Sequence, residues 1–171
     1  MRKVILQLAA SLDGFIEGPN GEYDWCFTDQ DYGMSEFLKR VDSMFIGRKS
    51  YELTLSMGDE AMPGFPKLTE YVFSTTLKEV KPGAIIINEN VEAEVKRIKN
   101  EQGKDIWLFG GASLTASLLN IGLIDEIILA VHPLILGAGK PLFSNIQNRV
   151  PLTLTGTKTY SSGLVMLRYT L

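Results

Sequence analysis

The sequence predicts an α/β fold built on a mostly parallel β-sheet that helices cover on both faces. Short apolar runs typical of buried strands alternate along the chain with segments of helical periodicity. Two of the strand-to-helix junctions carry glycine, at Gly47 and at Gly110-Gly111. The C-terminal residues instead alternate in polarity around the glycine turn 160–163, which predicts a terminal antiparallel hairpin.

Each strand is expected where a short apolar run ends in turn residues. Strands are predicted at Val4–Ala10, Ser43–Ile46, Glu70–Phe73, Ala84–Ile87, Ile106–Phe109 and Asp125–Ile135, and the hairpin at Leu152–Lys158 and Leu164–Tyr169. His132 and Pro133 interrupt the sixth of these runs, which indicates an edge, a bulge or a bend. His132 is the only histidine, and without an evident partner it favours a structural over a catalytic role.

Four helices are expected between these strands. One is led by Asp29, Asp31 and Glu36 and ends near Val41, and a short one opens at Gly47. The segment Val91–Asn100 has an apolar stripe at helical spacing, and a fourth helix follows Gly111 and stops at Gly122. The segment Met57–Pro66, which holds two glycines and two prolines, is expected to be a surface loop.

The composition predicts one globular domain that covers residues 1–171 and has a full core, with 45% hydrophobic and 22% charged residues. A net charge of -3 argues against a general nucleic-acid binder. The single Cys26 excludes an internal disulfide, and no Cys/His cluster suggests a metal site. The apolar runs are too short to span a bilayer, and no signal peptide is expected before the first strand, so we expect a cytoplasmic protein.

The two glycine junctions are candidate anion sites. Free N–H groups converge where a helix starts, the helix dipole favours negative charge there, and Gly110 and Gly111 let a phosphate approach the backbone. Arg48 and Lys49 stand at the other helix start, where the dipole disfavours cations, which makes sense if a polyanion binds between them. The alternatives are a tight turn without ligand and two solvated basic residues.

Three further groups of residues stay open between a functional and a structural role. Asp13 lies on the long glycine-bearing loop after the first strand, where it could act on a substrate or could stabilise a turn. The aromatic cluster 23–27, which includes Trp25, could line a pocket for a flat ring or could pack the loop onto the protein. Ser74 and Thr75 could bind a sugar or phosphate or could cap the turn after their strand.

Five pieces of the sequence, in order, resemble the dihydrofolate-reductase-like superfamily. They are Ser11–Ile16, Ile46–Glu52, Phe109–Ala112, Leu119–Glu126 and Pro133–Phe143. The last two are similar to the riboflavin branch of that superfamily. Within this branch the chain resembles the reductase domain of the bifunctional deaminase-reductase and the stand-alone relatives of that domain. The resemblance covers essentially the whole chain and implies a three-layer sandwich with a mostly parallel sheet and a C-terminal antiparallel hairpin.

The resemblance also implies a reductase that binds NADPH across the strand ends. Ala9, Ala10 and Ile16 would lie near the nicotinamide, and Ser74 and Thr75 near the adenosine end. The phosphates would lie against two sets of residues, Gly47, Arg48, Lys49 and Ser50 at one helix start and Gly110, Gly111, Ala112 and Ser113 at the other. Asp13 is the candidate catalytic residue, with Trp25, Phe15 and Asp31 lining the substrate pocket.

The sequence departs from that family in two places. Gly33 stands about where folate reductases carry an acid, so dihydrofolate is not the expected substrate. The sequence shows no deaminase domain or zinc motif, so we do not expect the bifunctional enzyme. The expected function is hydride transfer from NADPH to a C=N or C=O carbon of a small ring-bearing or phosphorylated substrate, by a homodimer. The alternatives are a non-catalytic nucleotide-binding protein and a divergent dihydrofolate reductase.

Overall fold

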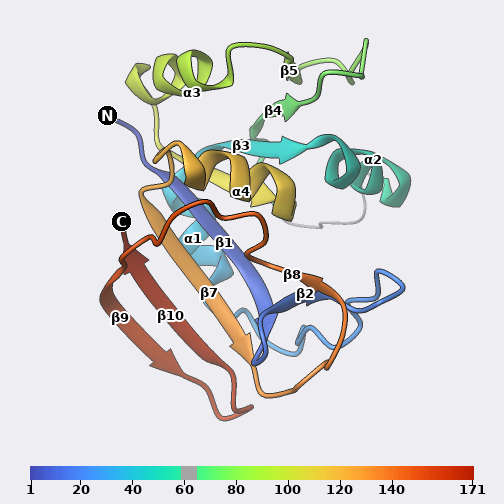
Figure 1. The fold of residues 1–171 in the computed structure, drawn as a ribbon, viewed down its shortest axis with the longest axis vertical. Helices are drawn as coiled ribbons and strands as arrows, with labels where there is room; N and C mark the ends of the chain where they lie inside the picture. Colours follow the sequence, from blue (N-terminus) through green and yellow to red (C-terminus); the bar gives the residue numbers. More distant parts are fainter. Residues whose placement is uncertain (59–64) are drawn as a thin grey trace.

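The computed structural model describes residues 1–58 and 65–171, in which one eight-stranded sheet organises the chain (Figure 1). Most of the predicted loop Met57–Pro66 lies outside the described residues. The strands of the large sheet are β1 (Val4–Ser11), β3 (Val41–Gly47), β4 (Thr69–Phe73), β5 (Ile85–Ile87), β6 (Asp105–Gly110), β7 (Glu126–His132), β9 (Thr153–Thr159) and β10 (Val165–Thr170). The helices are α1 (Met34–Arg40), α2 (Arg48–Met57), α3 (Val91–Asn100) and α4 (Ala112–Asn120).

The strand order is β5-β4-β3-β6-β1-β7-β10-β9, with β1 between two strands distant in the sequence. From β5 to β7 all neighbours run parallel, and β10 then pairs antiparallel with both β7 and β9. The predicted mostly parallel sheet with a C-terminal antiparallel hairpin is therefore confirmed. All the parallel strands end at one edge of the sheet, where α/β proteins bind their ligands.

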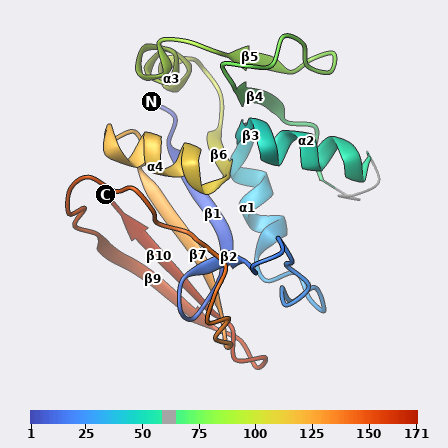
Figure 2. The ribbon, with the colours of Figure 1, turned by 45° about the vertical axis from the view of Figure 1, so that its right-hand side comes forward.

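Helices cover both faces of the sheet, as the alternating pattern predicted (Figures 1 and 2). In Figure 1, α4 lies in front of β1 and α1 lies behind it. Val95 and Ile98 of α3 and Leu118 of α4 bury their side chains in one core. Phe37 of α1 and Tyr51 of α2 belong to the core on the opposite face.

The first helix is shorter than predicted, because the chain before it takes a left-handed conformation. Tyr32 has φ 48° and Gly33 has φ 81°, which excludes both from a right-handed helix. The Asp31 carboxylate accepts hydrogen bonds from the Gly33 and Ser35 N–H groups, at 3.1 and 3.0 Å, and so orders the turn that opens α1. Asp29 and Asp31 therefore precede the helix, and of the three predicted acidic residues only Glu36 lies in its first turn.

A second, two-stranded sheet was not predicted. It pairs β2 (Phe15–Glu17), in the loop after β1, with β8 (Lys140–Pro141), in the segment after β7. A Cβ at Gly139 would lie 2.2 Å from the Glu17 carbonyl oxygen, so only glycine permits this approach. The glycine-rich segment 137–139 thus serves to bring β8 onto β2.

Ion pairs lie at the opposite ends of the parallel strands, where these strands begin. Lys99 of α3 places Nζ 2.9 and 2.7 Å from the two carboxylate oxygens of Asp125, which also accepts the Val4 N–H at 2.7 Å. Arg40 binds Glu126 through two hydrogen bonds of 3.0 and 2.8 Å. No helix in the part of the chain that the structure describes is long and apolar enough to cross a membrane.

Candidate active site

The two predicted glycine junctions lie side by side, because β3 and β6 are neighbours in the sheet. Ile46 at the end of β3 is in register with Gly110 at the end of β6. A Cβ at Gly47 would lie 3.6 Å from the Gly110 carbonyl oxygen and 3.7 Å from the Gly111 nitrogen. The peptide bond between Gly110 and Gly111 is cis. The starts of α2 and α4 therefore open onto the same space.

That space is a cavity of about 580 Å³ at the carboxyl ends of the parallel strands. Neither helix start has a side chain capping its first N–H groups, so these donors remain available to a ligand. Nine of the predicted cofactor-binding residues line the cavity, namely Gly47, Arg48, Lys49, Ser50, Ser74, Thr75, Gly111, Ala112 and Ser113. The structure thus brings together residues from three junctions, of which the first and the last are more than sixty positions apart in the chain.

Cations surround the cavity, but two of them also contact carboxylates. Arg48 pairs with Glu52 at 2.9 Å along α2, and Lys140 Nζ lies 2.7 Å from Glu17. Lys49 is exposed and makes no ion pair with any residue in 1–58 or 65–171. The cavity therefore combines oriented N–H donors with positive charge, the two features that hold a phosphate.

Lys140 is the lining residue that the sequence reasoning missed most plainly. The family resemblance covers the segment around Lys140 but implies no binding role for it. The position of Lys140 at the cavity depends on the pairing of β8 with β2. Asn88 and Thr76 also line the cavity, and they follow the ends of β5 and β4 in the chain. A rule that includes the residues flanking each strand end would have found these two, but no local signal marks Lys140.

Ser74 has a structural role in the turn after β4. Its Oγ accepts hydrogen bonds from the Thr76 and Leu77 N–H groups, at 3.2 and 2.9 Å, and the residue is 9% exposed. These contacts support the turn-capping interpretation, while the hydroxyl hydrogen remains able to donate. Thr75, by contrast, is exposed at the mouth of the cavity.

The three residues predicted near the nicotinamide do not line the cavity, because Ala9 and Ala10 lie in the last residues of β1 and Ile16 lies in β2. Ala10 is 1% exposed, whereas Ala9 and Ile16 are partly exposed. Ile16 belongs to β2, whose partner β8 carries Lys140 to the cavity. The β2–β8 pair is therefore the structural connection between the end of β1 and the anion-binding side.

Asp13 anchors the loop after β1 to the segment after β7. Its carboxylate accepts hydrogen bonds from Ser11 Oγ at 2.6 Å, Leu136 N–H at 3.1 Å and Gly137 N–H at 2.8 Å. The Ser11 hydroxyl, followed by the two backbone donors, lowers the pKa of Asp13. These contacts support the turn-stabilising alternative, and the catalytic role of Asp13 stays a prediction.

Trp25 packs against the only histidine at the end of β7. The two rings meet edge-on with centroids 5.3 Å apart, and the Phe27 ring lies 4.9 Å from His132. His132 Nε2 accepts the Phe27 N–H at 3.1 Å, so Nδ1 carries the proton and donates to the Ala130 carbonyl at 3.1 Å. Both ring nitrogens are engaged, which supports the structural role for His132 and the loop-packing alternative for Trp25.

The other two predicted pocket residues are held by backbone contacts. Phe15 pairs with Pro141 in the β2–β8 sheet and is partly buried. The Ser35 hydroxyl and N–H, together with the Gly33 N–H, lower the pKa of Asp31, whose side chain is committed to the turn before α1. A substrate role for either residue stays a prediction.

The residues of the cavity fit a pyrophosphate-containing dinucleotide. A Cβ at Gly111 would lie 3.3 Å from Ser50 Oγ and 3.9 Å from Lys140 Nζ, in the space between the helix starts and the lysine. Glycine keeps that space open to a phosphate that receives N–H donors from α2 and α4. Arg48, Lys49 and Lys140 supply the charge that two or three phosphates need.

Comparisons with known proteins agree with this architecture. The family described as RibD C-terminal domain matches residues 2–166 of the chain. The protein YyaP of Bacillus subtilis (strain 168), which is itself uncharacterized, is 45% identical over 98% of this chain and 94% of its own length.

Two solved structures share the fold. A protein of Shewanella sp. PV-4 that is provisionally assigned to riboflavin biosynthesis superposes with a TM-score of 0.81 at 24% identity, covering 98% of both chains. The diaminohydroxyphosphoribosylaminopyrimidine deaminase/5-amino-6-(5-phosphoribosylamino)uracil reductase of Thermotoga maritima has a TM-score of 0.75 at 13% identity, over 99% of this chain and 56% of that one. The predicted resemblance is confirmed, and the chain belongs to the RibD C-terminal domain family.

Proposed function

We propose that this protein is an NADPH-dependent reductase of a small ring-bearing or phosphorylated substrate, and that it resembles the 5-amino-6-(5-phosphoribosylamino)uracil reductase of riboflavin biosynthesis. The observation that carries the proposal is the cavity in which two uncapped helix starts meet Arg48, Lys49 and Lys140. Membership of the RibD C-terminal domain family supports the reductase class. NADPH supplies the hydride when bound, and the protein supplies binding, orientation and exclusion of water.

The helix starts and the basic side chains would bind different phosphates of the cofactor. The first N–H groups of α2 and α4 would donate to pyrophosphate oxygens, and Gly111 leaves room for their approach. Arg48 and Lys49, which line the cavity together with Thr75, would bind a further phosphate on the ribose. The proposal therefore includes a preference for NADPH over NADH.

The residues before α1 argue against the alternative of a divergent dihydrofolate reductase. Gly33 precedes α1 and carries no acid, and the Asp31 carboxylate is engaged by Gly33 and Ser35. Neither residue presents a free carboxyl group as proton donor at the helix start. The proton that accompanies the hydride to a C=N or C=O group would come from water or from another side chain.

Calorimetric titration with NADPH and NADH tests the proposal. We expect NADPH to bind in the micromolar range and NADH more weakly, and Lys49→Met to lower NADPH affinity by about three- to tenfold. Lys96→Met is the matched control, because Lys96 is an exposed helical lysine on α3 that pairs with Glu92. Absence of binding by both nucleotides would overturn the proposal. Binding without NADPH oxidation across pterins, pyrimidines and carbonyls would favour the non-catalytic alternative.

We also propose that the protein is a cytoplasmic homodimer. The edge strand β9 is exposed along nearly its whole length and carries Leu154 at 52% exposure, with Leu152 just before it at 40%. An exposed edge strand offers unpaired backbone groups to a second copy. Light scattering should give a mass about twice 19.0 kDa, and a mass near 19.0 kDa would contradict the dimer.

A further inference from the structure

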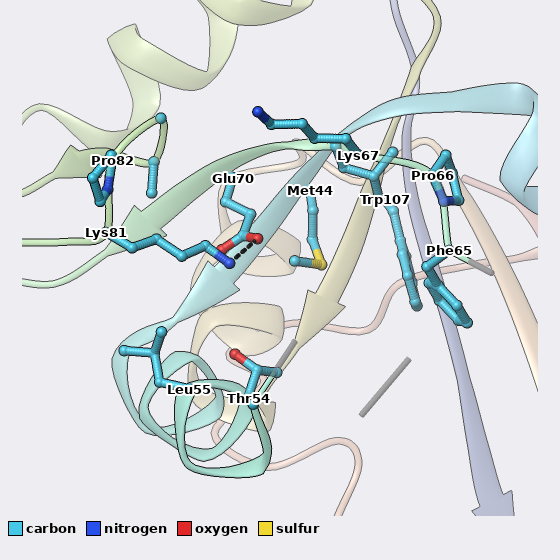
Figure 3. A pocket seen from close by; sticks show the side chains of 14 residues that line it. Met44, Thr54, Leu55, Phe65, Pro66, Lys67, Glu70, Lys81, Pro82 and Trp107 are labelled. Carbon is cyan, nitrogen blue, oxygen red and sulfur yellow. Dashed lines mark ion pairs between the residues drawn. The ribbon is translucent and has the colours of Figure 1, made fainter. Parts of the chain in front are cut away.

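A second cavity, of about 550 Å³, lies on the face of the sheet that α1 and α2 cover (Figure 3). It is lined by Thr54 and Leu55 in the last turns of α2, whereas the anion-binding cavity lies at the first turn of the same helix. The two cavities share no lining residue. Its size falls in the range of pockets that hold small molecules.

One end of this cavity carries a carboxylate with an unsatisfied oxygen. Glu70 Oε1 pairs with Lys81 Nζ at 2.7 Å, and the Glu70 side chain is 16% exposed. Its other oxygen, Oε2, is fully buried and receives no hydrogen bond from residues 1–58 or 65–171. A buried acceptor without a donor is costly, so a donor brought by a ligand would be stabilised here.

Lys81 is positioned to act together with Glu70. Its backbone N–H donates to the Tyr51 hydroxyl at 2.8 Å, which ties the segment before β5 to α2. The ammonium group has three donors and gives one of them to Glu70, which leaves others for an acceptor beside the carboxylate. Lys67 points its ammonium away from this pair (Figure 3).

The rest of the cavity is an apolar wall suited to a flat ring. Met44 lies between the ion pair and the aromatic side chains, and Trp107 and Phe65 stand at the far side (Figure 3). The Phe65 and Trp107 rings are stacked, with centroids 6.0 Å apart and an interplanar angle of 28°. Trp107 Nε1 is fixed by a 3.0 Å hydrogen bond to the Gln7 carbonyl, and the Trp107 ring, which is 3% exposed, forms the buried back of this wall behind Phe65.

We propose that this cavity binds a neutral, flat heterocycle through a cyclic amide edge. The ring N–H would donate to the Glu70 carboxylate and the adjacent C=O would accept from Lys81, while the ring packs on Met44 and Leu55. Because Glu70 and Lys81 neutralise each other, a net charge on the ligand would be repelled by one of them. This site is separate from the proposed cofactor cavity and stands whether or not that proposal holds.

The test is an NMR titration with the bicyclic lactam isoquinolin-1(2H)-one. The Trp107 indole and the Glu70 and Lys81 amide signals should shift on binding. The 2-methyl derivative, which lacks the N–H donor, should bind at least tenfold more weakly. Glu70→Gln should also weaken the lactam about tenfold, whereas the matched control Glu79→Gln, an exposed carboxylate in the segment that precedes Lys81, should leave affinity unchanged.

Three results would overturn the inference. They are no binding of the lactam, equal binding of the lactam and its methyl derivative, and shifts that fall outside the lining residues. The comparison of the two compounds uses the unmodified protein, so it stands even if Glu70→Gln does not fold. NADPH titration of the same samples distinguishes failure of this inference from failure of the proposed function, because loss of lactam binding should leave the NADPH affinity unchanged.

Discussion

Arg48 and Glu52 are paired across one turn of α2, with Arg48 Nη1 2.9 and 3.0 Å from the two carboxylate oxygens. The pair is solvent-exposed, with 39% and 46% of the two side chains accessible. Glu52 therefore competes with any phosphate that approaches Arg48 from the cavity. Such an exposed pair is weak, so a bound anion can replace it at small cost.

Glu52→Gln should raise NADPH affinity about two- to fourfold at low ionic strength, because it releases Arg48 for the phosphate. The measurement is calorimetric titration at two salt concentrations, and the gain should shrink as salt rises. Glu92→Gln is the control, since Glu92 makes the same type of pair with Lys96 on α3. An equal gain in both variants would mean that net charge alone, not Arg48, is responsible.

Asp13→Asn should lower the midpoint temperature of thermal unfolding. Turnover should fall only in proportion to the loss of folded protein. The asparagine keeps one acceptor but loses the charge that Ser11, Leu136 and Gly137 stabilise. Because the pKa of Asp13 is lowered in the fold, its contribution to stability is present above the ordinary carboxyl pKa and disappears on acidification through the lowered one. Turnover that falls more than about tenfold at an unchanged midpoint would favour the catalytic hypothesis instead.

The stability of the protein should fall as pH decreases below about 6.5, the ordinary histidine pKa, and His132 should be responsible. Burial lowers the pKa of His132, so the unfolded chain binds a proton in a range where the folded one does not. Stability then rises with pH through this window. Protonation would also cost the Phe27 N–H its acceptor at Nε2.

Thermal unfolding between about pH 5 and pH 8 checks this expectation. His132→Gln should show a flatter profile than the unmodified protein, and no other histidine complicates the comparison. Identical slopes for the two proteins would show that carboxylates, not His132, set the pH dependence.

Lys99→Met should lower the free energy of unfolding by about 1–3 kcal/mol, less than for a fully buried pair because Asp125 is 32% exposed. The lysine is 5% exposed and supplies two of the hydrogen bonds that satisfy Asp125. Urea unfolding measures the change. Lys96→Met, three residues earlier and exposed, should change stability by less than about 0.5 kcal/mol. Similar losses in both variants would refute the structural importance of the Lys99–Asp125 pair.

The sequence predicted the parts of the fold that local patterns determine. The apolar runs and glycine junctions gave the parallel strands and the starts of α2 and α4, and the residues of those starts do line one cavity. The helix stop at Gly122 is also confirmed, since Gly122 has φ 67° and its N–H binds the Leu119 carbonyl. These features depend on residues within a few positions of one another.

Features that depend on distant contacts were not predictable in the same way. The position of Lys140 follows from the β2–β8 pairing, across more than a hundred residues. The late start of α1 follows from left-handed Tyr32, a conformation that a tyrosine rarely adopts and no pattern signals. The sequence also left open whether Asp13, Trp25 and Asp31 act on substrate. The partners observed are serine hydroxyls and backbone N–H groups for the two aspartates and His132 for Trp25.

The central position of β1 has a consequence for how the protein is made. Residues 4–11 are synthesised before both partners of β1, which follow about a hundred residues later, since Val4 pairs with Ile106 and Ile5 with Glu126. A nascent chain that ends before β6 has no parallel neighbour for β1. The emerging chain must therefore keep this segment from misassociating until β6 and β7 have been synthesised, so the centre of the sheet assembles late.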